Sequence, residues 1–330
     1  MLNNCIDHGT ISKMNENYPQ KFASPYTAIF RNYINERIKS GKAISTTNRE
    51  IFYLNKFSEY FSLIKLKSLN DLTSSYIIGF MQKFSLNVKP ETLGGAATCL
   101  RLLLDYLYRT GCLDNDLSIY VPKVNRRAEH IPSTYAASDI KKMLERADRS
   151  GPKGKRDFAM LILAARLGMR ASDICNLTLD NIKWQQNSIE FISIKTSQFV
   201  SLPLLNDVGE AIIDYLKHGR CESDSKHLFL CFATPVRPLK PSNLHGIVGT
   251  ATRNADIHLL AGTHRGPHAL RASLASEMLN NNTPLPVISE ALSHKNTNTT
   301  RIYLKIDIEQ LRAYALDIPS LGNIWMGVAK

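Results

Sequence analysis

The sequence lacks the motifs by which many enzymes are recognised. Its 330 residues contain no G-x-x-x-x-G-K-[ST] loop for a nucleotide, no H-E-x-x-H helix for zinc and no C-x-x-C pair. No pair of carboxylates is spaced to hold two divalent metals, and acidic residues are scarce around the candidate site described below. We therefore expect no metal and no cofactor, so that side chains alone would carry any chemistry on a phosphodiester.

Long apolar runs are also missing. No stretch of 18 apolar residues occurs, and the N-terminal MLNNCIDHGT lacks the charged-then-apolar pattern of a signal peptide. The six cysteines show no metal-ligand spacing, which is typical of a reducing compartment, and Cys99 and Cys175 lie in apolar stretches where buried thiols are expected. The sequence predicts a cytoplasmic protein without a membrane part. The cysteines are Cys5, Cys99, Cys112, Cys175, Cys221 and Cys231.

Acidic residues are outnumbered along most of the chain. There are 41 Lys and Arg against 29 Asp and Glu, a formal net charge of +12. Residues 1–112 hold 14 basic and 8 acidic side chains and 113–136 hold three of each, so both halves share the excess. A basic field concentrates polyanions, of which nucleic acid is the commonest. We expect a protein that grips a DNA duplex from two sides; the alternative is that the charge serves solubility alone.

Helical periodicity dominates the first third of the chain. Residues 1–24 are polar and aperiodic and are expected as an N-terminal extension. Residues 25–112 then predict a compact four-helix domain, whose aromatic stripes suit a core better than a base-stacking platform. Its last helix has Pro at the start and Gly just past the end, as helices commonly do. The four helices are expected at 25–41, 46–64, 70–84 and 90–111.

The middle of the chain changes character. Residues 113–136 contain two prolines and no sustained period, which indicates an interdomain linker. Its basic side chains Lys123, Arg126 and Arg127 are expected to lie along a phosphate backbone. A solvated basic loop is the alternative interpretation.

A second domain is expected at 137–318, followed by a C-terminal tail at 319–330. It should open with an N-capped helix at 138–148, then a strongly apolar helix at 155–169. Residues 187–205 alternate β-branched and polar side chains, which predicts two or three short antiparallel strands with Lys195 at a turn. From Asp207 onward the chain should be helical apart from loops at 235–241 and 261–267. The expected fold class is mainly α with a small antiparallel β-sheet (α+β).

The segment PHALRAS holds the clearest chemical signal. His268 and Arg271 are three residues apart and share one face of a helix. Arg170 and Arg271 can each bind non-bridging phosphate oxygens through paired N–H donors. Tyr303 can attack the phosphorus as a phenolate in a cationic neighbourhood. His268 can accept the tyrosine proton and return it.

Three further side chains complete the expected site. Lys195, on a hairpin turn, can donate a proton to the leaving 5′ oxygen, although Lys183 is a nearby competitor. His294 can hydrogen-bond a phosphate oxygen. Asp173, three residues after Arg170, can orient that arginine. A third histidine, His264, is expected as a structural residue or a phosphate contact.

The order of these residues resembles the tyrosine site-specific recombinases, the phage-integrase and Xer-like family. The motifs are Arg in LGMRASDI, Lys in ISIKTSQFVSLPL, His-x-x-Arg in PHALRAS, His in LSHKNTNTT and Tyr in TRIYLKID. The resemblance covers essentially the whole chain, because that family places a helical, SAM-like core-binding domain and a basic linker before the catalytic domain. Two positions depart from the pattern. Ser293 replaces the glycine of the usual Leu-Gly-His, and Ala272 replaces a histidine that often follows the second arginine.

The resemblance implies a recombinase that cleaves and rejoins double-stranded DNA sites through a covalent 3′-phosphotyrosine, for integration or excision of a mobile element or for Xer-like resolution. It also implies a tetramer on DNA, a monomer when free, and a role for accessory proteins. The alternative is a DNA-binding protein of the same fold without catalysis. A type IB topoisomerase shares the catalytic groups, but the two-domain size and the tail after Tyr303 favour recombination. That tail can pack on its own domain or on a neighbouring protomer.

Overall fold

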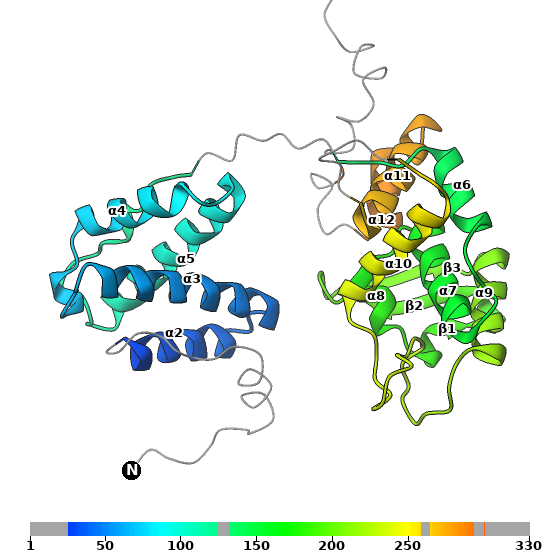
Figure 1. Ribbon diagram of the computed structural model, residues 1–330, viewed down its shortest axis with the longest axis horizontal. Coiled ribbons are helices and arrows are strands. Elements are labelled where there is room, and N and C mark those ends of the chain that lie inside the picture. Colours follow the sequence, from blue (N-terminus) through cyan, green and yellow to red (C-terminus); the bar gives the residue numbers. More distant parts are fainter. Residues whose placement is uncertain (1–25, 125–131, 259–264, 294–299, 301–330) are drawn as a thin grey trace, which may run out of the picture. The chain divides into compact units, whose positions relative to one another are not determined.

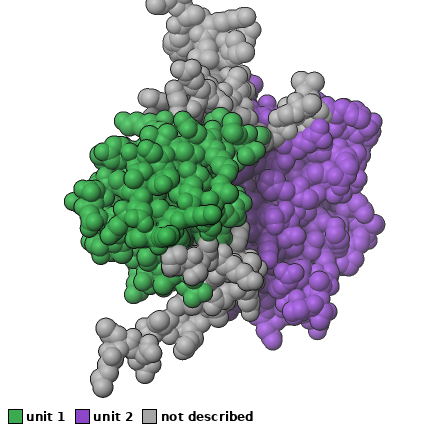
Figure 2. All heavy atoms as spheres, turned by 60° about the vertical axis from the view of Figure 1, so that its left-hand side comes forward, with its two compact units in different colours: residues 1–129 green, residues 130–330 purple. Residues whose placement is uncertain are grey.

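The computed structural model describes residues 26–124, 132–258, 265–293 and Thr300. Its chain divides into two compact units, residues 1–129 and 130–330, which Figure 2 draws in different colours. Each unit has its own hydrophobic core. None of the helices in the described ranges is long and apolar enough to cross a membrane. The linker residues Arg126 and Arg127, His264, His294, Tyr303 and the tail lie outside the described residues.

The first unit is built from four helices, as predicted. Aromatic and leucine side chains from all four helices fill its core, including Phe30, Phe57, Phe80 and Leu104. The predicted aromatic stripes are therefore mainly core. The helices are α2 (Thr27–Lys39), α3 (Ile44–Leu63), α4 (Ser74–Ser85) and α5 (Pro90–Arg109), drawn in blue to cyan in Figure 1.

The helix ends follow the sequence signals in α5 but not in α4. Pro90 opens α5, and Gly111 just beyond it has a left-handed φ of +71°, which glycine adopts at little cost. The prediction that the third helix opens at Asn70 was wrong. Ser68 forms a capping box with Asp71, which closes a separate 3-10 turn, and α4 begins only at Ser74.

The ends of the expected linker pack on the units themselves. Leu113 and Val121 are buried in the first core, held by a short 3-10 turn at Ser118–Tyr120. Tyr135 is buried in the second core, and its backbone N–H donates to the Ser273 hydroxyl at 2.7 Å. Apolar side chains at both ends therefore shorten the segment that can act as a connector. Lys123 is exposed just after Val121.

The second unit surrounds a central apolar helix, α7 (Pro152–Arg166), whose residues from Phe158 to Ala165 are all buried. The other helices are α6 (Ala137–Glu145), α8 (Ala171–Asn176), α9 (Asn206–His218), α10 (Pro241–Asn254), α11 (Pro267–Asn280) and α12 (Leu285–Ala291), in green to orange in Figure 1. Helices α6, α8, α9, α10 and α11 all contact α7. This central helix therefore fixes the elements that carry the candidate site residues.

A small sheet accompanies these helices, in agreement with the predicted α+β class. Strands β1 (Ile182–Lys183), β2 (Ser188–Ile192) and β3 (Phe199–Pro203) are antiparallel in the order β1-β2-β3. Ile189, Phe191, Val200 and Leu202 alternate toward the core, which explains the period-two pattern.

Two local predictions in this unit were wrong. The residue that caps α6 is Ala136, and no side chain caps the helix. The chain between α9 and α10 is a long irregular loop that begins at Gly219, not near residue 235. The Arg220 guanidinium stabilises the first part of this loop, because it donates hydrogen bonds to the carbonyls of Ser225, His227 and Leu228. These hydrogen bonds replace those that a helix would have supplied.

Candidate active site

Arg170 is held at the start of α8 by the turn that follows α7. Gly168 makes this turn with a left-handed φ of +58°. A Cβ on Gly168 would lie 2.9 Å from Leu292 Cδ2 and 3.0 Å from Leu274 Cδ2, so a side chain here would also displace both leucines. The glycine in LGMR therefore lets Arg170 leave the core at a fixed position.

The two candidate phosphate-binding arginines grip the same stretch of chain. Arg271 on α11 is buried and donates to the carbonyl of Gly168 at 2.7 Å and to the carbonyl of Leu292. Arg170 donates to the carbonyl of Ser293 at 2.9 Å. Both guanidiniums thus hold the turn after α12, immediately before His294. The backbone dipoles orient each arginine before any substrate arrives.

A buried carboxylate joins Arg170 to the lysine hairpin. Asp173 Oδ2 lies 3.8 Å from Arg170 Nη1 and accepts from the Ser193 hydroxyl at 3.2 Å. Its other oxygen accepts from the backbone N–H of Ile194 at 2.9 Å. Asp173 therefore contacts Arg170 as the sequence suggested, and it also anchors the β2–β3 connection. Ser193, fully buried between Arg170 and Asp173, was not foreseen.

Lys195 lies in the turn between β2 and β3, as predicted. The turn is closed by Ser197 N–H donating to the Ser193 carbonyl at 2.8 Å, with Ser197 in a left-handed conformation of φ +55°. Lys195 is exposed on this turn. The competitor Lys183 lies in strand β1, paired with Ser188, and is not part of the turn.

His268 lies in the first turn of α11, near two arginines, a lysine and a second histidine. Loss of water around its ring lowers the pKa below the usual 6.5, and the charges of Arg271, Lys195, His245 and Arg170 lower it further. Near neutral pH its imidazole is therefore uncharged in the free protein and can accept a proton. Because residues of the Lys195 turn, α8, α10 and α11 all act on the His268 imidazole, these four elements converge around it.

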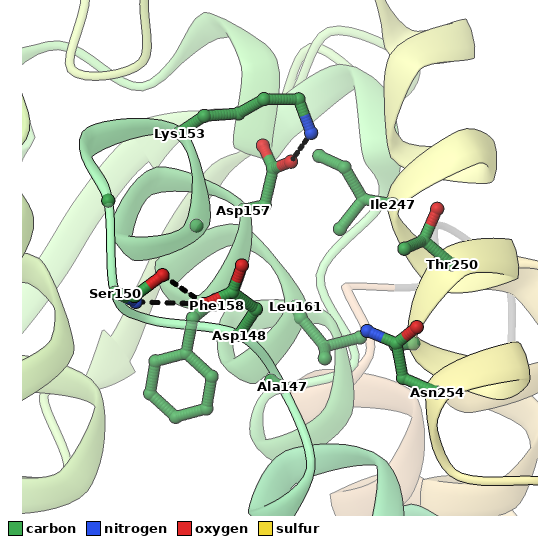
Figure 3. A pocket seen from close by; sticks show the side chains of 13 residues that line it. Ala147, Asp148, Ser150, Lys153, Asp157, Phe158, Leu161, Ile247, Thr250 and Asn254 are labelled. Carbon is green, nitrogen blue, oxygen red and sulfur yellow. Dashed lines mark hydrogen bonds and ion pairs between the residues drawn. The ribbon is translucent and has the colours of Figure 1, made fainter.

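The described part of the chain shows no group of three His, Cys, Asp or Glu that could hold a metal ion. A hollow of about 250 Å³ lies elsewhere in the unit, between α7, α10 and the loop before α7 (Figure 3). Its carboxylates have partners already: Asp148 accepts from Ser150, and Asp157 pairs with Lys153 at 2.7 Å and with Arg156 at 2.6 Å. This hollow therefore offers no reactive group comparable to the cluster around His268.

Several features of the site depend on tertiary contacts that sequence analysis did not identify. Ser193 and the backbone of Ile194 face Asp173 only because the hairpin folds over α8. Gly168 had a local signal, since a glycine between an apolar helix and Arg170 is typical of a left-handed turn. His245 had no signal of this kind.

The chain is similar to proteins of a known family. The phage integrase family matches residues 134–310. A Sinorhizobium fredii protein named as an integrase/recombinase (y4rA) is 36% identical over 76% of this chain and 61% of its own length, and a second (y4gC) is 37% identical over 57% of this chain and 97% of its own. The Bacillus subtilis tyrosine recombinase XerC is 23% identical over 79% and 86%. The chain spans about three-fifths of the length of y4rA.

Solved structures share the fold. The XerH site-specific recombinase bound to a palindromic difH substrate aligns with a TM-score of 0.69 and 20% identity, covering 89% of each chain. A lambda integrase dimer bound to a core site aligns with a TM-score of 0.65 and 14% identity, covering 84% of this chain and 94% of that one. With the family match over the unit that holds Arg170, His268 and Arg271, these likenesses lead to one conclusion. This chain belongs to the phage integrase family.

Proposed function

We propose that this chain is a site-specific DNA recombinase that cleaves and rejoins DNA strands through a covalent 3′-phosphotyrosine on Tyr303. The observation that carries the proposal is the convergence of Arg170, Arg271, His268 and the Lys195 turn, in which Asp173 joins Arg170 to that turn. Two arginines with preset orientation beside a neutral histidine suit a phosphodiester better than a small neutral substrate.

Each group has a distinct role in the proposed step. The Tyr303 oxygen attacks the phosphorus, His268 accepts the phenolic proton, and the bond from phosphorus to the 5′ oxygen breaks. Lys195 donates the proton that makes the departing oxygen a free 5′ hydroxyl. Arg170 and Arg271 hold the non-bridging oxygens, where charge builds up, and His294 adds a hydrogen bond. Rejoining runs the same steps in reverse with a 5′ hydroxyl from another strand as the nucleophile.

The proposal includes double-stranded DNA as the partner and a tetramer as the working assembly, because exchange of four strands requires four active sites. The N-terminal unit and the linker, with Lys123, Arg126 and Arg127, would add further contacts to the duplex. The cytoplasm is the expected location.

In a tetramer that closes as a head-to-tail ring, each C-terminal tail contacts the next protomer. Truncation after Asp317 should weaken assembly on paired sites while sparing single-site binding; equal assembly would favour a tail packed on its own unit.

The experiment that tests the proposal selects the DNA site and detects cleavage together. The protein is incubated with a pool of nicked random-sequence duplexes, in which a cleaved strand loses its short 3′ fragment and cannot religate. Complexes that resist denaturant are recovered and sequenced. Wild type should enrich one site in EDTA as well as in magnesium, and Arg170→Ala or Arg271→Ala should slow trapping about 100-fold. DNA binding without any trapping would favour the non-catalytic alternative.

A further inference from the structure

The imidazole of His245 lies against Gly266, the residue just before the helix that carries His268. His245 is exposed on α10, one residue after Leu244, which is buried in the second core. An ideal Cβ on Gly266 would lie 2.6 Å from His245 Nδ1 and 2.9 Å from Cε1. Such distances are shorter than carbon and nitrogen can approach without a bond. The ring therefore occupies the space that a side chain at residue 266 would need.

Gly266 is the N-cap of α11, so its position decides how the helix starts. Its carbonyl accepts the N–H of Ala269 at 3.0 Å, the first hydrogen bond of the helix. Its φ of +156° with ψ of −170° belongs to a region that is essentially restricted to glycine. Pro267 is buried directly after it and His268 follows. A shift of this residue would therefore move His268, which lies within the first turn.

His245 also belongs to the charged environment of His268. Four groups on four elements act on that imidazole: Arg271 on α11, Lys195 on the β2–β3 turn, His245 on α10 and Arg170 at the start of α8. Three of them are the expected phosphate-facing groups of the site. His245 is the fourth, and the proposed reaction steps leave it without a role.

We propose that His245 is a positioning residue of the active site: its ring, packed against the Gly266 backbone, fixes the start of α11 and so the orientation of His268. Gly266 is the complementary half of the device, because a Cβ at this residue would meet the ring in the position that it now occupies. This inference rests on the proposed recombinase activity for its catalytic readout. The contact itself can be measured without that activity.

The first set of variants separates ring contact from general damage. In single-turnover trapping on the selected DNA site, His245→Ala should lower the rate about tenfold while DNA binding changes less than about twofold, because orientation and not affinity is lost. His245→Asn, whose amide can occupy the Nδ1 edge, should recover most of that rate. His218→Ala, which removes an exposed histidine from α9, is the matched control and should match wild type. The acid limb of the rate profile should shift in both His245 variants, since each removes a group that lowers the pKa of His268, and should stay unchanged in His218→Ala.

The second set tests the contact with Gly266 directly. Gly266→Ala should lower the trapping rate more than His245→Ala, because the new Cβ strikes the ring and the backbone disfavours any L side chain. In the double variant, loss of the ring makes space for that Cβ. The double variant should therefore trap faster than Gly266→Ala alone, by at least about threefold, with the remaining deficit due to the backbone. Thermal unfolding and ¹⁵N-histidine spectra of the free protein report whether each variant is folded and whether the His268 signals move.

The outcomes distinguish the two proposals. If wild type never traps DNA, the recombinase proposal fails, and movement of the His268 signals in folded His245→Ala still decides the contact. If wild type traps DNA and His245→Ala traps at the same rate with the same pH profile, His245 has no positioning role. The inference would also be overturned if the trapping rate of the double variant fell by the product of the two single-variant factors. Such independent effects would mean that His245 and Gly266 do not interact.

Discussion

The carboxylate of Asp173 accepts a hydrogen bond of 2.9 Å from the backbone N–H of Ile194, one residue before Lys195. The same carboxylate lies 3.8 Å from Arg170. One buried side chain thus sets the spacing between a group proposed to bind the phosphate and a group proposed to protonate the leaving oxygen. Small displacements within such a site are costly to catalysis.

Asp173→Asn should therefore slow cleavage by about tenfold to 100-fold with little change in DNA affinity. The amide keeps the shape of the side chain but loses the charge facing Arg170, and hydrogen bonds to charged groups are worth about 1.5–3 kcal/mol. Asp180→Asn, an exposed acid in the following 3-10 turn, is the matched control. Cleavage by Asp173→Asn at the wild-type rate would show that the carboxylate does not set this geometry.

The pKa of His268 should lie below 6.5 in the free protein, because its ring loses water and lies near Arg271, Lys195, His245 and Arg170. Because the pKa of His268 is lower in the folded protein than in the unfolded chain, the unfolded chain binds this proton more tightly at pH values between the two pKa values. The histidine's contribution to stability is then lost as the pH falls through this window. Lys195→Met, which removes one of the charges, should raise the pKa toward its usual value. Histidine NMR titration measures the His268 pKa in the wild type and in Lys195→Met. A pKa above 6.5 in the free wild-type protein would contradict the proposed surroundings of His268.

Ser293→Gly should stabilise the second unit by about 0.5–1 kcal/mol. Ser293 has a left-handed φ of +52°, a conformation that costs an L residue roughly 1–2 kcal/mol, partly offset by the greater freedom of glycine when unfolded. Glu290→Gly in the exposed part of α12 should instead cost about 1 kcal/mol. Denaturant unfolding of both variants compares them. No gain at Ser293, or an equal loss at both positions, would refute the argument.

Glu50→Gln should destabilise the first unit by about 3 kcal/mol, because it leaves a largely buried Arg37 without its carboxylate. Glu59→Gln, which breaks an exposed pair with Lys56, should change stability by less than about 1 kcal/mol. Hydrogen exchange in the full chain can assign the loss to α2–α5. Equal effects of the two changes would mean that burial does not decide the strength of these pairs.

The sequence predicted most of the architecture because its signals are local. Proline at the start of α5, glycine beyond its end and the alternation of β2 and β3 depend on nearby residues alone. The loop after α9 was missed because the hydrogen bonds of Arg220, which reach three carbonyls up to eight residues away, have no sequence pattern.

For the candidate site, too, the sequence predicted some residues and missed others. Arg170, Asp173, Lys195, His268 and Arg271 were predicted as site residues by type, order and spacing, and their side chains or turns lie near one another in the structure. Ser193 and His245 were missed because each makes its contact with a segment that is distant in the sequence. Such contacts depend on the folded arrangement of the chain and leave no pattern in the sequence.

Covalent attachment of Tyr303 to DNA is the step on which the proposed function depends. The most direct measurement is protease digestion of the trapped complex, followed by mass spectrometry of the peptide that carries the nucleotide adduct. We expect the adduct on Tyr303, and no trapped complex in Tyr303→Phe, which should still bind the DNA site because only the nucleophilic oxygen is lost. Trapping by Tyr303→Phe, or an adduct on any other residue of the wild-type chain, would contradict the proposed mechanism.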